Sequence, residues 1–230
     1  RRMPAADRAR FTSTIFRIDN GHIAIQPGVA VYLMRQILRG LEALHRKGFV
    51  HSDIKPSNVM VDRLGYPRVI DHGRAGKSGE KVRILFGSPG YMAPEAHKRE
   101  PIVNQSDLYS VGLVGLEMLR GVPLITDPTA TEADILRQKQ ELPNHLDDIL
   151  PIYVRENYSL MNSLRGLLAL DVSQRSSRAD QVESGQSGLS VIHRQLTKIG
   201  KDTEYDRELQ DFIAHWVDPE TDRVTHPPLP

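Results

Sequence analysis

The eight residues His51-Ser52-Asp53-Ile54-Lys55-Pro56-Ser57-Asn58 hold the densest group of chemically active side chains in the chain. Asp53 is a carboxylate that can accept a proton from a hydroxyl group. Lys55 can place a positive charge beside an anionic group that is being transferred. Asn58 offers an amide oxygen to a hard cation such as Mg²⁺, and Asp71 offers a second oxygen ligand. A base, a cation and two oxygen ligands for magnesium are the groups that phosphoryl transfer requires.

Each of these side chains alone has an ordinary structural explanation, because a single aspartate in a loop is usually a turn residue or a cap. The combination is much more specific. The order H-x-D-x-K-P-x-N is followed, after a hairpin-like segment, by Asp71-His72-Gly73. This spacing favours a phosphoryl-transfer site over a set of unrelated turn residues.

Segments with clear periodicity flank residues 51–58 on both sides. Apolar residues recur at helical spacing from residue 29 onward, and Gly48 follows as a stop signal, which predicts a helix of about five turns. On the other side, residues 59–61 and 68–70 are short β-prone runs around Leu64-Gly65-Tyr66-Pro67, which predict a hairpin.

The rest of the chain is mainly helical in pattern. Residues 74–90 have no sustained period, so they predict a long loop. Two interpretations are open for its basic residues, contact with an acidic substrate and a solvated loop, and the second is favoured for Arg74, Lys77, Lys81 and Arg83. Residues 106–120 are apolar nearly all round, as in a helix at the centre of a domain. The remaining expected elements are helices at Thr131–Glu141 and Asn157–Leu170, a loop at 172–188, and an amphipathic helix with Leu209, Phe212, Ile213 and Trp216 packed on its own domain.

The composition excludes several classes of protein. The 230 residues contain 30 Lys and Arg against 29 Asp and Glu, so no global field recruits nucleic acid or an anionic membrane. The chain has no cysteine, which excludes disulfides, thiolate zinc sites and cysteine nucleophiles. It contains no apolar run of about 18 residues and no visible signal peptide, so the expected location is the cytoplasm.

With these motifs in place, the sequence resembles the protein kinase family, on its Ser/Thr branch and of the bacterial type. The resemblance covers residues from about 28 to 178 and follows the family order. Asp71-His72-Gly73 stands for D-F-G, Gly87 to Glu95 is similar to the segment that ends in A-P-E, and Ser106 to Gly112 is similar to the start of the buried central helix. Leu170 to Arg175 is similar to the late Arg motif, with Val172 where Pro is usual.

The resemblance implies roles for the catalytic residues. Asp53 would accept the proton of the substrate hydroxyl, and Lys55 would contact the γ-phosphate of ATP, which favours Ser/Thr over Tyr substrates in a protein partner. Asn58 and Asp71 would hold Mg²⁺. Ser88 would position Asp53 and Lys55.

The resemblance also implies structural roles. His51 begins the catalytic loop, and Asp107 would hold the backbone of that loop. Glu95 and Arg175 would form a buried ion pair. Catalytic residues are thus expected in loops that a helical framework supports.

Two departures from the family pattern have consequences. Ser52 replaces the Arg of H-R-D, which in the family pairs with a phosphorylated activation loop, and Ser78 is the sole hydroxyl residue between Asp71 and Ser88. We therefore expect no activation by loop phosphorylation. His72 replaces the Phe of D-F-G, and we expect its imidazole to pack in the same place.

The chain is expected to lack the smaller nucleotide-clamping lobe of a kinase. The first 27 residues are too few for that lobe, and the sequence has no G-x-G-x-x-G and no V-A-I-K-like strand. The expected fold class is mainly α (α+β), a kinase-like large lobe with small β-hairpins at the catalytic loop. The expected division is a truncated lead-in at 1–27, the large lobe at 28–180 with catalytic loop 51–58 and activation segment 71–95, and a partly helical extension at 181–230.

Three interpretations follow from this conflict between intact catalytic residues and a missing lobe. The first is a Ser/Thr kinase whose front end is absent from this chain, which begins with Arg1; the chain would then be inactive or weakly active alone. The second is a noncatalytic, kinase-like binding module. The third is a relic or an unrelated helical protein, which the density of motifs disfavours.

Overall fold

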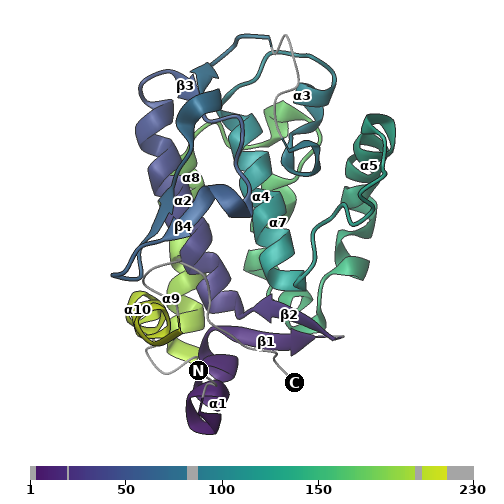
Figure 1. Ribbon diagram of the computed structural model, residues 1–230. Coiled ribbons are helices and arrows are strands. Elements are labelled where there is room, and N and C mark those ends of the chain that lie inside the picture. Colours follow the sequence, from purple (N-terminus) through teal and green to yellow (C-terminus); the bar gives the residue numbers. More distant parts are fainter. Residues whose placement is uncertain (1–3, 20, 82–87, 200–203, 217–230) are drawn as a thin grey trace.

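The computed structural model describes residues 4–19, 21–81, 88–199 and 204–216 (Figure 1). The helices are α1 (Ala5–Thr14), α2 (Pro27–His45), α3 (Pro94–His97), α4 (Asn104–Arg120), α5 (Glu132–Ile149), α6 (Ile152–Arg155), α7 (Tyr158–Leu167), α8 (Ala179–Ser184), α9 (Leu189–Ile199) and α10 (Tyr205–Trp216). The strands are β1 (Phe16–Asp19), β2 (His22–Ile25), β3 (Phe49–Val50), β4 (Val59–Val61), β5 (Pro67–Val69) and β6 (Gly76–Lys77). In this described part, the strands form three antiparallel pairs, β1 with β2, β3 with β6 and β4 with β5. The predicted fold class, mainly α with small hairpins, is confirmed.

Helix α2 forms where the apolar period predicted it and begins slightly earlier, at Pro27. Proline suits the first turn of a helix because its missing N–H has no intrahelical partner there. The apolar residues of this period include Val31, Met34, Leu38 and Leu41, and all four are buried. The helix ends at His45, and Gly48 adopts a φ of +78°, which glycine reaches without strain.

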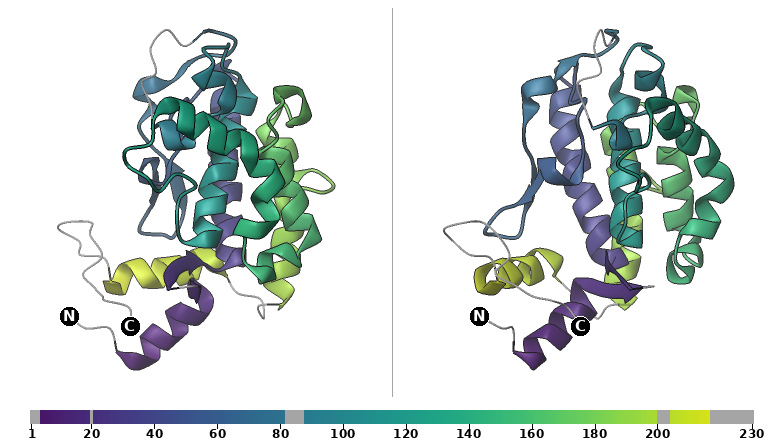
Figure 2. Two further views of the ribbon diagram at one scale, coloured as in Figure 1. Left: turned by 90° about the vertical axis from the view of Figure 1, so that its right-hand side faces the viewer. Right: turned by 45° about the vertical axis from the view of Figure 1, so that its right-hand side comes forward.

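Helix α4 lies at the centre of the molecule, as its apolar composition predicted, and packs against α2 and α7 (Figures 1 and 2). Two glycines allow these close approaches. A Cβ added at Gly115 would lie 2.6 Å from Met34 Sδ of α2. A Cβ added at Gly112 would lie 2.9 Å from Leu168 Cδ2 and 3.0 Å from Leu167 Cβ, at the end of α7. The main hydrophobic core therefore forms around α4.

Helix α5 is longer than the predicted segment 131–141 and continues through Pro143 to Ile149. Thr131 caps its start, with its side-chain oxygen accepting a hydrogen bond from Asp134 N at 3.2 Å. Proline removes one backbone donor, but burial of Leu142 and Leu146 on the core side keeps the helix continuous. The other predicted helix, at 157–170, is shorter than expected and ends at Leu167, with Asn157 as its cap.

The predicted hairpin after the catalytic loop is present as β4–β5, with Val59 opposite Val69. Asp62 organises its turn, since its Oδ1 accepts hydrogen bonds from Leu64 N and Tyr66 N, both at 3.0 Å. The predicted loop at 74–90 contains the short strand β6, which pairs with β3. Residues 82–87 of that loop, Arg83 among them, lie outside the described residues.

The expected loop at 172–188 is wrong in part, because α8 occupies residues 179–184. Ala179 is fully buried against the core, and Glu183 forms ion pairs with Arg35 at 2.8 Å and Arg39 at 3.0 Å, both on α2. These long-range contacts stabilise a short helix whose own sequence is polar.

The two ends of the described chain pack together. Tyr205 and Leu209 of α10 join a cluster with Phe11, Ile15 and Val29, and Phe212 makes edge contacts with Phe11 and Phe16, each at 5.3 Å between ring centroids. The structure thus places the stripe beginning at Leu209 against its own domain, although the Trp216 side chain lies outside the described part. In that part, we find no helix long and apolar enough to cross a membrane.

The packing of α4 on α7 makes a testable prediction. Gly112→Val should destabilise the fold by about 1–3 kcal/mol, because the new side chain must displace Leu167 and Leu168. Gly166→Ala on α7 is the control, since a Cβ there meets open space and should stabilise the helix by about 0.5–1 kcal/mol. Urea denaturation of both variants measures this, and equal stability of the two would contradict the packing.

Candidate active site

The backbone of the catalytic loop is held by Asp107, a buried residue in the first turn of α4. Its Oδ1 accepts a hydrogen bond from Ser52 N at 2.9 Å, and its Oδ2 accepts one from His51 N at 2.8 Å. His45 Nε2, at the end of α2, lies 2.8 Å from the same Oδ2. Asp107 therefore joins α2, the catalytic loop and α4 through one carboxylate.

These hydrogen bonds hold the loop in an uncommon conformation. Ser52 has a φ of +67°, in the left-handed region, which costs a non-glycine residue about 1–2 kcal/mol. Hydrogen bonds to a charged acceptor contribute about 1.5–3 kcal/mol, enough to offset that cost. The turn at Ser52 places the next residue, Asp53, inside the site.

The four predicted catalytic residues come together around the carboxylate of Asp53. Its Oδ2 lies 3.0 Å from Lys55 Nζ and accepts a hydrogen bond from Asn58 Nδ2 at 3.1 Å. Its Oδ1 accepts a longer one from Ser88 N at 3.3 Å. Lys55 Nζ also donates to Ser88 Oγ at 3.0 Å, so Lys55 bridges the base and the later segment.

The two predicted metal ligands lie at one end of the β4–β5 hairpin. Ile70 N donates to Asn58 O at 2.9 Å, which places Asp71, the next residue, beside Asn58. Asn58 Nδ2 is used by Asp53, so Oδ1 is its atom for a cation. Asp71 is exposed and accepts a hydrogen bond from Gly73 N at 3.4 Å.

Within the described residues, no group of three His, Cys, Asp or Glu forms a complete metal site. An amide oxygen and a carboxylate fit Mg²⁺, which keeps water and phosphate oxygens as its other ligands.

His72, which stands in the place of Phe in D-F-G, packs edge-on against His51, with the ring centroids 5.1 Å apart. Burial is the main cause of a lowered pKa at His51, so this imidazole is neutral at pH 7. Its Nε2 lies 3.2 Å from Ile70 O and its Nδ1 accepts from Asp53 N at 3.4 Å. A neutral ring with the proton on Nε2 satisfies both contacts.

Arg74 was interpreted from sequence as part of a solvated loop, and the structure corrects this. Its Nη1 lies 3.3 Å from Asp53 Oδ2. The guanidinium is partly exposed, with 39% of the side chain accessible, so it can leave the carboxylate without a large rearrangement. Its position directly after Asp71-His72-Gly73 was the signal in the sequence that could have identified it.

Glu95 and Arg175 form the expected buried ion pair. Nη1 and Nη2 of Arg175 donate to the two Glu95 oxygens at 2.7 and 3.0 Å. The remaining donors reach backbone oxygens of Ala169, Gln105 and Leu170. Ser106 Oγ also donates to Glu95 at 2.8 Å. The pair thus fastens the end of the activation segment to α4 and to the segment after α7.

Lys139 of α5 is a functional candidate that sequence reasoning missed. Its side chain is fully buried, and its Nζ contacts Pro89 O at 2.5 Å, Met92 O at 2.7 Å and His97 Nε2 at 3.0 Å. Burial lowers the pKa of Lys139 to about 7, against a smaller opposing effect of Glu95. A lysine in a polar helix has no local feature that distinguishes it from a solvated one. The contacts hold the segment that follows Ser88.

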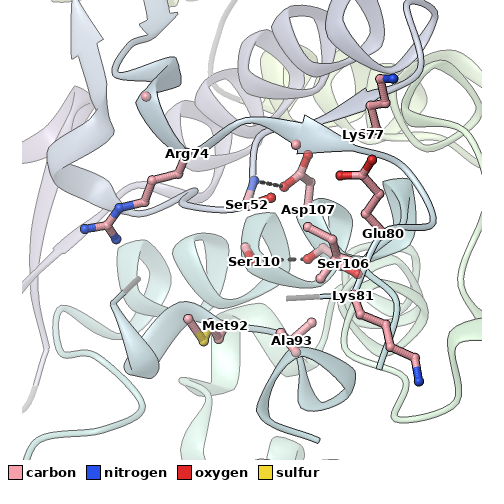
Figure 3. Close-up of a pocket in the computed structure, with 14 residues that line it drawn as sticks. Ser52, Arg74, Lys77, Glu80, Lys81, Met92, Ala93, Ser106, Asp107 and Ser110 are labelled. Atoms are coloured by element: carbon pink, nitrogen blue, oxygen red, sulfur yellow. Dashed lines mark hydrogen bonds between the residues drawn. The ribbon is translucent and has the colours of Figure 1, made fainter. Parts of the chain in front are cut away.

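A cavity of about 380 Å³ lies beneath the catalytic loop (Figure 3). Ser52 and Asp107 line one side, where Figure 3 shows the hydrogen bond between them, and Met92 and Ala93 line another. Ser52, in place of arginine, contributes a short side chain to this wall. The cavity adjoins the site already described, since Arg74, the partner of Asp53, also lines it.

The Glu95–Arg175 pair makes a prediction about stability. Arg175→Ala should cost about 3–5 kcal/mol, because it leaves a buried carboxylate without its partner. Arg178→Ala is the control, since its pair with Asp180 is exposed and should contribute no more than about 1 kcal/mol. Thermal denaturation of both variants measures the difference. An unchanged melting temperature for Arg175→Ala would contradict the stabilising role of the ion pair.

Lys139 makes a prediction about pH. Its pKa is about 7 in the folded chain, against an ordinary value of 10.5 for a solvated lysine, so between these values the unfolded chain binds one more proton and stability rises with pH. The free energy of unfolding of the wild type, minus that of Lys139→Met, should rise with a slope of up to about 1.4 kcal/mol per pH unit. Urea denaturation at several pH values between these limits measures the slope. A flat difference would show that Lys139 keeps its ordinary pKa.

Comparisons with known proteins agree with this geometry. A family model for the protein kinase domain matches residues 8–185 and so includes α1 and the β1–β2 hairpin. The catalytic subunit of the human cAMP-dependent protein kinase PRKX is 27% identical over 210 residues, 90% of this chain and 51% of that protein. The serine/threonine-protein kinase pkn2 of Myxococcus xanthus is 30% identical over 180 residues, 72% of this chain and 21% of that protein.

A third relative, the serine/threonine-protein kinase 17A of rabbit (Oryctolagus cuniculus), is 39% identical over 101 residues, 41% of this chain and 25% of that protein. The chain therefore spans about half of the human relative's length and less of the other two. All three relatives are named as protein kinases, and two of them, one bacterial, are named as serine/threonine-protein kinases, as the motifs predicted. Because the family model covers well over half of its residues, the chain belongs to the protein kinase family.

Proposed function

We propose that this chain is the catalytic lobe of a serine/threonine protein kinase, which transfers the γ-phosphate of ATP to a hydroxyl group of a protein. The observation that carries the proposal is the arrangement around Asp53, where Lys55, Asn58 and Ser88 all contact one buried carboxylate. An aspartate with a purely structural role does not require a neighbouring, partly exposed lysine that also contacts Ser88 of the activation segment.

In this proposal, Asp53 orients the substrate hydroxyl and accepts its proton. Lys55 places its ammonium group beside the phosphoryl group in transit, where the developing negative charge needs stabilisation. Ser88 holds both residues, through its backbone N–H to Asp53 and its hydroxyl group to Lys55. The loop is assembled on Asp107, so little reorganisation is required when the substrate binds.

Asn58 Oδ1 and the carboxylate of Asp71 are the groups that would hold Mg²⁺ with ATP. When bound, Mg²⁺ neutralises charge on the phosphate oxygens and orients them. The 230 residues contain no Gly-rich loop and no V-A-I-K-like strand. We therefore expect slow phosphate transfer by this chain alone. Separately, we propose that its ATP-dependent role lies in the cytoplasm.

One observation favours a second candidate, a kinase-like binding module without catalysis. Arg74 contacts Asp53 Oδ2, which Lys55 contacts as well. If this second ion pair persists with substrate present, it favours the charged carboxylate and weakens Asp53 as a proton acceptor.

Calorimetric titration with ATP, with and without Mg²⁺, tests the proposal. We expect Mg²⁺-dependent binding that Asp71→Asn abolishes, because Asp71 supplies the carboxylate ligand. Glu204→Gln, an exposed change outside the catalytic loop, is the control and should bind as the wild type does.

Phosphate transfer to a Ser/Thr substrate then separates the two candidates. Asp53→Asn should keep Mg²⁺-dependent ATP binding and lose transfer. Binding without any transfer, in the wild type and in Arg74→Ala, would favour the module. A folded sample that binds no ATP at millimolar concentration would contradict the kinase proposal and favour the module.

A further inference from the structure

A second cavity, of about 640 Å³, lies at the other end of α4 from the catalytic loop. Figure 1 shows the β1–β2 hairpin at this end and β3 with α3 at the opposite end. Four basic residues line the cavity from four elements or their ends: Arg17 of β1, His22 of β2, Arg120 of α4 and Arg155 of α6. Nothing in the proposed kinase function uses these residues.

The arginines of this cavity lack acidic partners. Elsewhere in the described chain, arginines such as Arg165 and Arg175 contact carboxylates directly. By contrast, Arg17, Arg120 and Arg155 form no ion pair with any residue that the structure describes. Among the described residues that line the cavity, one is a carboxylate, Asp148, whose side chain is 75% exposed and lies 3.5 Å from His145 Nδ1. The lining therefore carries an excess of positive charge.

Arg17 is the most informative of these residues. Its guanidinium stacks on the ring of Tyr153, 3.3 Å from the ring centroid. The Nε atom of Arg17 is buried and has no hydrogen-bond partner in the described structure. Stacking on an aromatic face fixes the plane of a guanidinium and leaves its N–H edges available to an in-plane acceptor. A buried donor without an acceptor is costly, and an anion in the cavity would remove that cost.

Arg120 is in a similar state. The one side-chain hydrogen bond of Arg120 to a residue that the structure describes, from Nη1 to Pro123 O, is long at 3.4 Å. Burial lowers the pKa of Arg120, and no neighbouring acid opposes that effect. The carbonyl end of α4 favours a cation at this position and accounts for part of the placement of Arg120. It does not account for Arg17, which lies on a strand.

From these observations we propose that this cavity binds a phosphate-type oxyanion, with Arg17 and Arg120 as its main ligands and Arg155 and His22 at its edge. Guanidinium groups bind phosphate oxygens through paired N–H donors, which gives both charge and geometric fit. The site is separate from the catalytic loop, so the proposal does not depend on kinase activity. The phosphoryl group can come from a small molecule or from a phosphorylated side chain, since both present the same oxygens.

Titration of the 230-residue chain with inorganic pyrophosphate in the absence of Mg²⁺, followed by two-dimensional NMR and calorimetry, tests the proposal. We expect saturable shifts at residues around Arg17 and Arg120. Arg17→Gln and Arg120→Gln should each weaken binding by roughly tenfold or more, because each removes a charge-assisted contact. Arg165→Gln is the matched control, an arginine outside the cavity that pairs with Asp147, and it should bind as the wild type does. Asp71→Asn should also leave this binding unchanged, which separates the site from that for ATP.

The exposed Arg155 provides a variant that keeps the fold if the half-buried ones do not, and Arg155→Gln should weaken binding less than Arg120→Gln.

A phosphoserine peptide in place of pyrophosphate distinguishes the two sources of the phosphoryl group. A tighter complex with the peptide indicates a phosphorylated side chain, and a weaker complex indicates a small molecule. The absence of binding at millimolar pyrophosphate would overturn the proposal. So would binding that Arg17→Gln, Arg120→Gln and Arg155→Gln all leave unchanged, or that Arg165→Gln weakens equally.

Discussion

The carboxylate of Asp107 accepts hydrogen bonds from two consecutive backbone amides, those of His51 and Ser52, and contacts His45 Nε2 as well. The catalytic loop has no regular secondary structure of its own at this point, so its conformation depends on these contacts. They stabilise the left-handed Ser52, and that turn directs Asp53 toward Lys55 and Asn58. Asp107 can do this because it lies at the start of α4, the helix around which the main hydrophobic core forms.

Buried polar contacts from α4, α5 and the segment before α8 also position the activation segment. Arg175 and Ser106 hold Glu95, and Lys139 holds the carbonyl groups of Pro89 and Met92. Each of these contacts involves a group that is costly to bury unpaired. The site residues are therefore fixed in loops, where chemistry needs exposed atoms, while α4, α5 and the segment before α8 supply their anchors.

Much of this arrangement was predictable from local sequence. Helices α2 and α4 follow from apolar periodicity, and the β4–β5 hairpin follows from β-prone runs around a glycine. Motifs predicted the set of Asp53, Lys55, Asn58 and Ser88. This is possible because a loop with fixed geometry needs its functional residues at fixed spacing along the sequence. The structure brings these four side chains into contact, as the resemblance implied.

The features that sequence reasoning missed all depend on contacts between distant residues. Lys139 and Pro89 are fifty positions apart, and no local pattern distinguishes a buried lysine in a polar helix from a solvated one. Helix α8 depends on ion pairs with α2, and α5 passes Pro143 because its apolar side is buried. The unpaired Arg17 becomes informative only when Tyr153 is seen beneath it.

The geometry of the site depends most on Asp107, and amide hydrogen exchange measured by NMR in the wild type and in Asp107→Asn tests this dependence directly. Asparagine keeps one oxygen acceptor but loses the charge and the second acceptor. We predict slow exchange at His51 N and Ser52 N in the wild type, and a loss of protection at both in the variant, while amides in the middle of α2 stay protected. Equal protection of His51 N and Ser52 N in the two proteins would contradict the view that Asp107 sets the conformation of the catalytic loop.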